Sequence, residues 1–273
     1  MKIIKNIQEL KKELKHTSKS IGFVPTMGAL HEGHISLIKQ SRRQNELVVV
    51  SIFVNPTQFL QGEDFSTYPS KDLADTKICE LCDVDILFMP NINTMYKEDE
   101  LSIKAPKKRS YILEGLSRPS HFDGVLQIVL KLFNIVKPTN AYFGKKDAQQ
   151  LSLIQQMVSD LFLDINIIQC EIIRDENGLA LSSRNAYLDS KQKKQALNIV
   201  KSLRVATQEI MLGNRNIEKI KSSMYKVLEN MDIEYIEILS QDFRKIQELE
   251  LKNSIILVAV RVGNTRLIDN IWI

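Results

Sequence analysis

Short apolar runs alternate with amphipathic segments along the first two thirds of the chain. Near-continuous apolar stretches, such as residues 46–54, are typical of strands that are covered on both faces, as in a parallel sheet. Apolar residues at helical spacing fill the intervals. We expect strands at 21–24, 46–54, 84–89, 141–144 and 165–173, and helices starting near 33 and spanning 71–81, 124–136 and 148–161. This alternation predicts a doubly wound, Rossmann-like α/β sheet.

The pattern changes after residue 174. Residues 175–178 read Asp-Glu-Asn-Gly, a turn signal, and residues 191–230 predict helices. Strands are expected at 233–239, 254–262 and 266–271, the last two joined partly by Gly263-Asn264. We therefore expect a nucleotide-binding domain over 1–174 and a second, smaller α+β C-terminal domain over 175–273.

Composition and charge narrow the class of protein. The net charge is +4, with basic clusters such as 107–109 and 191–194 that lack interleaved aromatic residues. An RNA-binding module is one hypothesis, but small anionic substrates explain the positive charge equally well, and we expect no nucleic-acid partner. No segment approaches the roughly 20 apolar residues of a membrane span, and the first residues lack a secretory signal. We expect a cytoplasmic protein that binds no membrane.

The three cysteines support this expectation. An odd number of cysteines argues against a disulfide framework and fits a reducing compartment. Cys79 and Cys82 have the spacing of redox or zinc motifs, but they lie in an expected helix without a second pair of ligands. Two ordinary helix cysteines are the better interpretation.

The junction between strand 21–24 and the following helix is the strongest candidate site. Pro25 and Gly28 form a turn, and the helix start offers unpaired backbone N–H groups and a partial positive charge to an anion. Gly33 has no side chain to block a phosphate, and the imidazoles of His31 and His34 can donate hydrogen bonds to phosphoryl oxygens. A solvated histidine pair and a zinc site are the alternatives, the second lacking a third ligand nearby.

Five ordered motifs resemble a known family. Pro25-Thr26-Met27-Gly28 followed by His31-Glu32-Gly33-His34 is similar to the His-x-Gly-His nucleotidyltransferase superfamily and, within it, to the pantothenate synthetase (pantoate–β-alanine ligase) family. The other four motifs are VSIFVNPTQF at 50–59, EGLSRPSHF at 114–122, FGKKDAQQ at 143–150 and GLALSSRN at 178–185. They follow the family's order and spacing over nearly the whole chain.

The resemblance implies an enzyme that ligates (R)-pantoate and β-alanine to pantothenate through a pantoyl adenylate. ATP would be a substrate with Mg²⁺ carried on its phosphates, with no tightly bound organic cofactor and no protein-bound metal. The larger domain would also bind pantoate, the smaller one would close over the ATP site, and the protein would be a homodimer. A related nucleotidyltransferase acting on a phosphorylated alcohol is the alternative, which leaves Gln58, Gln150 and the 182–184 signature unexplained.

The same resemblance assigns site residues. The catalytic residues would be His34, His31 and Lys146. The ATP-binding residues would be Met27, Gly28, Ala29, Leu30, His31, Glu32, Gly33, His34, Gly144, Lys145, Lys146, Asp147, Ile173, Leu181, Ser182, Ser183 and Arg184. Pantoate and β-alanine would be bound by Gln58 and Gln150. The chain departs from the family pattern at Ser120, Asp123 and Lys145, where Gly, Arg and Glu are usual.

Overall fold

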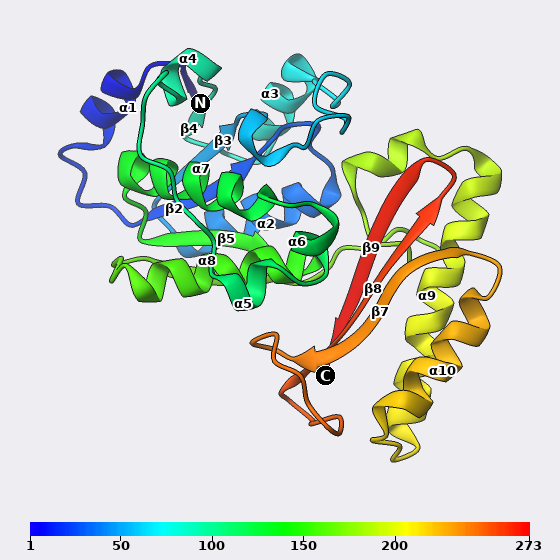
Figure 1. Ribbon diagram of the computed structural model, residues 1–273. Coiled ribbons are helices and arrows are strands. Elements are labelled where there is room, and N and C mark those ends of the chain that lie inside the picture. Colours follow the sequence, from blue (N-terminus) through cyan, green and yellow to red (C-terminus); the bar gives the residue numbers. More distant parts are fainter. The chain divides into compact units, whose positions relative to one another are not determined.

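The computed structural model describes residues 1–273, and the chain divides into two compact units (Figure 1). Unit 1 comprises Met1–Lys145 and Gln149–Glu171, and unit 2 comprises Lys146–Ala148 and Ile172–Ile273. The division expected at residue 174, with its functional roles, stays a prediction. No helix is both long enough and apolar enough to cross a membrane.

Unit 1 contains a six-stranded parallel sheet with the strand order β1-β4-β3-β2-β5-β6. The strands are β1 (Lys2–Ile4), β2 (Ile21–Thr26), β3 (Leu47–Ile52), β4 (Ile86–Phe88), β5 (Asn140–Gly144) and β6 (Asn166–Cys170). From β2 the chain builds outward through β3 and β4, whereas β5 and β6 lie on the other side of β2. The strand order therefore reverses between β2 and β5, which is where doubly wound sheets bind ligands.

Helices cover both faces of this sheet. Val24 and Val50 of the sheet share one buried cluster with Ile38 of α2 and Cys79 of α3. On the other face, the ring of Phe133 in α7 packs edge-on against Phe23 of β2, with ring centroids 6.4 Å apart. The helices of unit 1 are α1 (Ile7–Leu14), α2 (Glu32–Gln44), α3 (Asp72–Leu81), α4 (Ile92–Met95), α5 (Lys107–Ser110), α6 (Glu114–Ser117), α7 (His121–Val136) and α8 (Ala148–Asp160), with 3₁₀ turns η1 (Pro56–Gln58) and η2 (Lys145–Asp147) at its loops.

Unit 2 is a small α+β structure, as expected. Its antiparallel sheet has the order β7-β8-β9, and the β8–β9 hairpin turns at Gly263, whose φ of 58° lies in the left-handed region. Ile199 and Leu203 of α9 pack with Met224 of α10 against the buried face of this sheet. The elements are η3 (Ser183–Tyr187), α9 (Ser190–Met211), α10 (Ile217–Leu228), β7 (Asp232–Ser240), β8 (Ser254–Val262) and β9 (Thr265–Trp272). The α/β fold class with a smaller C-terminal α+β part is confirmed.

Gly124 sets how closely α7 approaches η1, and replacing it tests this packing. A Cβ atom at Gly124 would lie 2.3 Å from the backbone oxygen of Thr57 and 2.7 Å from the backbone nitrogen of Gln58. Backbone atoms cannot rotate away, so we expect Gly124→Ala to destabilise unit 1 by about 1–3 kcal/mol despite alanine's better helix propensity. Urea unfolding measures this. Gly144→Ala is the control, since no atom lies within 4 Å of its added Cβ, and an equal loss there would contradict the packing argument.

Candidate active site

The loop between β2 and α2 is held in shape by a buried carboxylate. Gly28 and Ala29 have φ angles of 85° and 50°, so two consecutive residues adopt the left-handed conformation. The backbone N–H groups of Ala29 and Leu30 then both point at Asp75 of α3 and donate to its two carboxylate oxygens at 2.8 Å. Asp75 is 1% exposed. A buried carboxylate requires such donors, so the loop and α3 stabilise each other.

The two histidines cap the first turn of α2 reciprocally. Nδ1 of His31 accepts a hydrogen bond from the Gly33 N–H at 3.1 Å, and Nδ1 of His34 accepts a longer one from the His31 N–H at 3.4 Å. Their ring centroids are 4.2 Å apart. A neutral imidazole that accepts at Nδ1 carries its proton on Nε2, so each ring is an Nε2–H donor. This is the protonation that hydrogen bonding to phosphoryl oxygens requires.

Gly33 is needed for the capping as well as for access. A Cβ atom at this position would lie 2.8 Å from Cε1 and 2.9 Å from Nδ1 of the His31 ring, so any larger residue displaces that ring. The zinc alternative finds no support, because the structure contains no group of three His, Cys, Asp or Glu side chains that could hold a metal ion. The helix start of α2 with its two histidines therefore fits an anion better than a cation.

Gln58 lies at the end of η1, after β3, and is only 8% exposed. Its Nε2 is 3.0 Å from Sδ of Met27, so the loops that follow β2 and β3 meet here. Its Oε1 accepts a hydrogen bond of 3.1 Å from Nδ2 of Asn55. The structure thus brings Gln58 to the His-motif loop, whereas Gln150 lies in the first turns of α8 in the same unit.

The backbone of Gln58 is held separately by a charged network. Arg118 makes two hydrogen bonds to Glu63, Nε to Oε1 at 2.6 Å and Nη2 to Oε2 at 2.7 Å, and Nη2 also donates to the Gln58 carbonyl at 3.2 Å. Nδ1 of His121 donates to the same carbonyl at 2.7 Å, and Nε2 of His121 accepts from Arg118 at 3.1 Å. His121 is therefore neutral, with its proton on Nδ1.

The pKa values of this network follow from its contacts. Burial, and then the neighbouring positive charge of Arg118, lower the pKa of His121 to about 4. Burial alone would raise the pKa of Glu63, but the hydrogen bonds and charge of Arg118 outweigh it and lower that pKa below its ordinary value. At neutral pH the network therefore contains an ionised Glu63 and a neutral His121.

Unit 2 carries the remaining predicted residues. Ile173 and Leu181 lie opposite each other, since the Leu181 N–H donates to the Ile173 carbonyl at 3.0 Å. Ser182 caps η3 by accepting from the Arg184 N–H at 3.3 Å. The carbonyl of Lys146 accepts from Nδ2 of Asn270 at 2.8 Å, which ties residues 146–148 to β9.

The three departures from the family pattern all have local explanations. Ser120 has a φ of 67°, a left-handed conformation that glycine adopts at lower cost. Asp123 accepts from the Ala105 N–H at 2.8 Å and pairs with Lys104 at 2.9 Å. Lys145 pairs with Glu171. Each exchanged charge therefore has a partner of opposite sign or a backbone donor within unit 1.

The cysteines are free, buried thiols. Burial, followed by the nearby Asp75 carboxylate, raises the pKa of Cys79 to about 12, and burial raises the pKa of Cys170 to about 12 as well. The pKa of Cys82 is also raised by burial. Protonated, buried thiols are poor nucleophiles and poor metal ligands, which agrees with the interpretation of Cys79 and Cys82 as ordinary helix cysteines.

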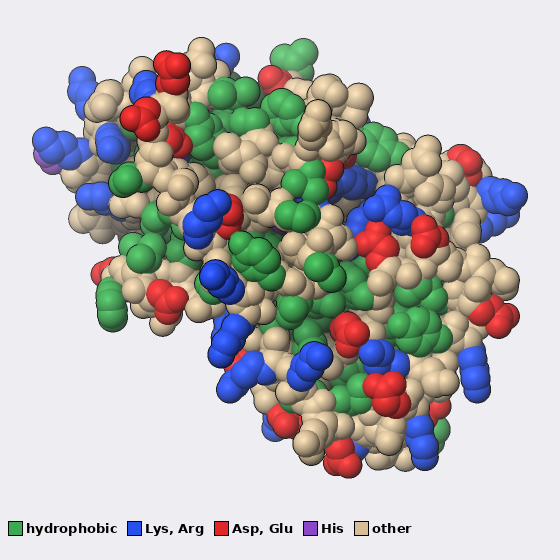
Figure 2. Space-filling model, viewed as in Figure 1, with side chains coloured by type: hydrophobic (Ala, Val, Ile, Leu, Met, Phe, Trp, Pro, Cys, Tyr) green, Lys and Arg blue, Asp and Glu red, His purple; other side chains and the backbone are tan.

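Sequence reasoning missed Asp75, Asn55, Glu63 and the network around His121. For Asp75 the only available signal was a single carboxylate one turn before Cys79 on the apolar face of a helix. Asn55, Arg118 and His121 lay inside quoted motifs, but nothing in the sequence indicated that they converge on Gln58. On the face of the molecule in Figure 2, Lys and Arg side chains are interspersed with Asp and Glu.

Comparisons with known proteins agree with one another. The sequence profile of the family described as Pantoate-beta-alanine ligase matches residues 2–272. The pantothenate synthetases of Aliarcobacter butzleri and Sulfurimonas denitrificans are 58% and 56% identical over 273 residues, covering 100% of each chain. The crystal structure of pantothenate synthetase from Thermus thermophilus has a TM-score of 0.95 at 34% identity, covering 100% of this chain and 99% of that one.

A second solved structure carries ligands. It is the pantoate-β-alanine ligase from Francisella tularensis, complexed with "Beta-gamma ATP" and β-alanine. Its TM-score is 0.82 at 39% identity, covering 100% of this chain and 97% of that one.

The neutral state of His121 predicts a loss of stability in mild acid. Its pKa is about 4 in the folded protein and near the ordinary value of 6.5 in the unfolded chain, so between these values the unfolded state binds more protons. The stability is fully present above 6.5 and is lost as the pH falls toward 4. We expect His121 to account for about 2 kcal/mol of the decrease between about pH 7 and about pH 5.

Urea unfolding of the wild type and of His121→Gln at the two pH values measures this contribution. Glutamine keeps a donor for the Gln58 carbonyl but does not titrate, so the variant should show a shallower dependence on pH. Equal slopes in the two proteins would show that His121 is not buried in its neutral form.

Proposed function

The chain belongs to the pantoate–β-alanine ligase family, and from this membership we infer its reaction, the ATP-dependent ligation of pantoate and β-alanine to pantothenate. The observation that carries this inference is the match over residues 2–272, supported by relatives aligned over their whole length. The ligand-bound relative, with its ATP-type nucleotide and β-alanine, fits the same reaction.

We propose that the reaction proceeds through a pantoyl adenylate. A carboxylate oxygen of pantoate attacks the α-phosphorus of ATP, the bond to the β-phosphate oxygen breaks, and pyrophosphate leaves. The amine of β-alanine, in its neutral form, then attacks the acyl carbon. The bond between that carbon and the bridging oxygen breaks, AMP leaves with the oxygen, and the nitrogen loses a proton as the amide forms.

The first step accumulates charge on phosphoryl oxygens, so it requires positioned donors more than a protein nucleophile. We propose that the Nε2–H groups of His31 and His34, together with the start of α2, stabilise this charge. Their capping hydrogen bonds support the proposal, because the rings are already oriented before a nucleotide binds. Lys146 adds a full positive charge in the proposal, and Arg184 offers a planar fork for phosphate.

The remaining assignments belong to the same proposal. Gln58 and Gln150 bind pantoate, and Gln58 also lies near β-alanine, while the ATP-binding residues predicted in both units keep that role. Mg²⁺ enters with the phosphates of ATP, as is usual for an ion that keeps several waters. We also propose a homodimer in the cytoplasm. The three free cysteines support the reducing compartment, and light scattering against the chain mass of 31.3 kDa tests the dimer.

Product analysis with labelled pantoate tests the proposed route. The protein is mixed with ATP, Mg²⁺ and pantoate that carries ¹⁸O in its carboxylate, with and without β-alanine. Pantothenate and AMP should form only when β-alanine is present, and AMP should contain ¹⁸O from pantoate. Unlabelled AMP would reject the adenylate, and turnover with a phosphorylated alcohol instead of pantoate would indicate the related nucleotidyltransferase reaction.

Replacing His34 tests the proposed charge stabilisation. We expect His34→Ala to slow the release of pyrophosphate in a single turnover with pantoate by about 10²- to 10³-fold, the effect of losing one preorganised donor. Rapid-quench measurement of pyrophosphate is the readout. His16→Ala, which removes an exposed histidine of the same unit, is the matched control. Wild-type pyrophosphate release from the His34 variant would exclude this role.

A further inference from the structure

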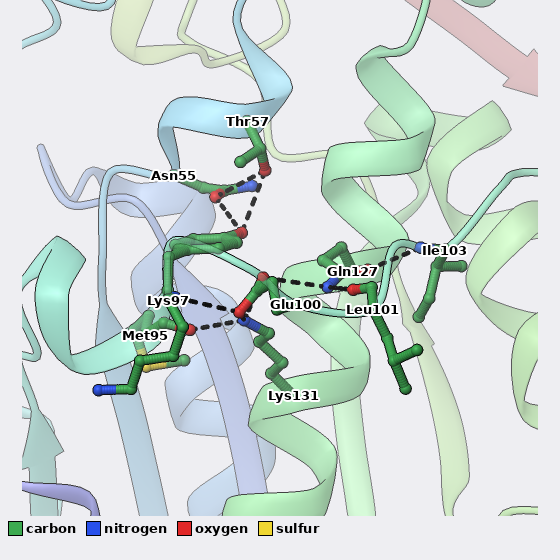
Figure 3. A network of polar contacts seen from close by, with 10 residues as sticks. Asn55, Thr57, Met95, Lys97, Glu100, Leu101, Ile103, Gln127 and Lys131 are labelled. Atoms are coloured by element: carbon green, nitrogen blue, oxygen red, sulfur yellow. Dashed lines mark hydrogen bonds and ion pairs between the residues drawn. The ribbon is translucent and has the colours of Figure 1, made fainter.

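The Asn55 amide has a single possible orientation. Its Oδ1 accepts from the hydroxyl of Tyr96 at 2.6 Å and from Oγ1 of Thr57 at 3.1 Å, as Figure 3 shows. Its Nδ2 donates to the Gly124 carbonyl and to Oε1 of Gln58, both at 3.1 Å. Two donors face the oxygen and two acceptors face the nitrogen, so a flipped amide would oppose like groups at every contact. Asn55 is also 1% exposed, where such mismatches are costly.

The orientation of Asn55 determines the orientation of Gln58. Because Nδ2 of Asn55 occupies Oε1 of Gln58, the Gln58 amide keeps its NH₂ group directed away from Asn55. That group lies 3.0 Å from Sδ of Met27, and a thioether is a weak acceptor. Gln58 is thereby set as an N–H donor. A carboxylate or hydroxyl oxygen of a substrate matches a donor, whereas a flipped Gln58 would present its own oxygen to it.

Tyr96 is itself fixed by α7. Nζ of Lys131 lies 4.1 Å from the centroid of the Tyr96 ring and also binds the Met95 carbonyl and Glu100, each at 2.6 Å (Figure 3). Gln127, one turn earlier on α7, binds the Leu101 carbonyl at 2.7 Å. The segment 95–103 is thus attached to α7 by side chains that have no other evident task.

Burial raises the pKa of Tyr96 above its ordinary value, so its hydroxyl stays protonated and remains a donor. We propose that Tyr96 is a positioning residue for pantoate: its hydroxyl orients Asn55, which in turn directs the N–H donors of Gln58 to the substrate. This inference rests on the proposed binding of pantoate at Gln58. Tyr96 itself contacts no substrate in it.

The test is Tyr96→Phe, which removes the hydroxyl and keeps the ring under Lys131. Initial rates are measured against pantoate at saturating ATP and β-alanine, and against ATP at saturating pantoate. We expect the KM for pantoate to rise about three- to tenfold, the net value of one hydrogen bond, with the KM for ATP unchanged. Thr57→Val, which removes the other hydroxyl on Asn55, should raise the same KM in the same direction.

The matched control is Tyr142→Phe. Tyr142 is also buried in unit 1, and its hydroxyl bonds Asn45 at 2.7 Å and Gln44 at 2.8 Å, away from Gln58. Its removal should lower stability comparably but leave the KM for pantoate unchanged. An equal rise in that KM for both phenylalanine variants would overturn the inference, because a general loss of stability would then explain it.

Gln58→Ala and the double variant separate the inference from the proposal beneath it. If Tyr96 acts through Gln58, the double variant should have the same KM for pantoate as Gln58→Ala alone. Additive effects, or a raised KM in Gln58→Ala with none in Tyr96→Phe, would overturn the role of Tyr96. An unchanged KM in Gln58→Ala would instead reject the binding of pantoate at Gln58, and with it the inference.

Discussion

The pair of hydrogen bonds from Ala29 and Leu30 to Asp75 is the constraint on which the site depends. A carboxylate that is 1% exposed is tolerated only with strong donors, and here both donors come from a loop with two left-handed residues. The loop ends where α2 begins, so its shape sets where His31 caps the helix. Gly33 and His34 follow in the first turn. The orientation of both imidazoles is therefore fixed from α3, a different helix of the sheet.

The order of the strands determines what this loop meets. β3 and β5 flank β2, all three are parallel, and their carboxyl ends lie at one edge of the sheet. The loop after β3 carries Asn55 and Gln58, and the contact of Gln58 with Met27 joins it to the His-motif loop. The close approach of α7 at Gly124 supports η1 from behind. The site therefore combines a cationic helix start with a neutral amide, which suits a phosphate beside a hydroxy acid.

The sequence was sufficient to predict the central strands, the start of α2 and the change to an α+β unit, because each has a strong local pattern. It did not predict β1, which has three residues and only one buried, or α1 behind it. The strand expected at 165–173 ends at Cys170, which leaves Ile173 opposite Leu181 in unit 2. Asp75 and Tyr96 were missed because their partners lie 46 and 41 residues away, beyond any local periodicity.

The histidines illustrate how neighbours assign different tasks to one side chain. His31 and His34 accept backbone N–H groups at Nδ1, which leaves the proton on Nε2. His121 has the opposite tautomer, because the Gln58 carbonyl takes its Nδ1–H and Arg118 donates to its Nε2. Thus Gln58 is held at its backbone by a neutral histidine and at its side chain by Asn55. A residue fixed at both ends loses little further conformational entropy when a ligand binds, so its contribution to binding depends on those neighbours rather than on glutamine alone.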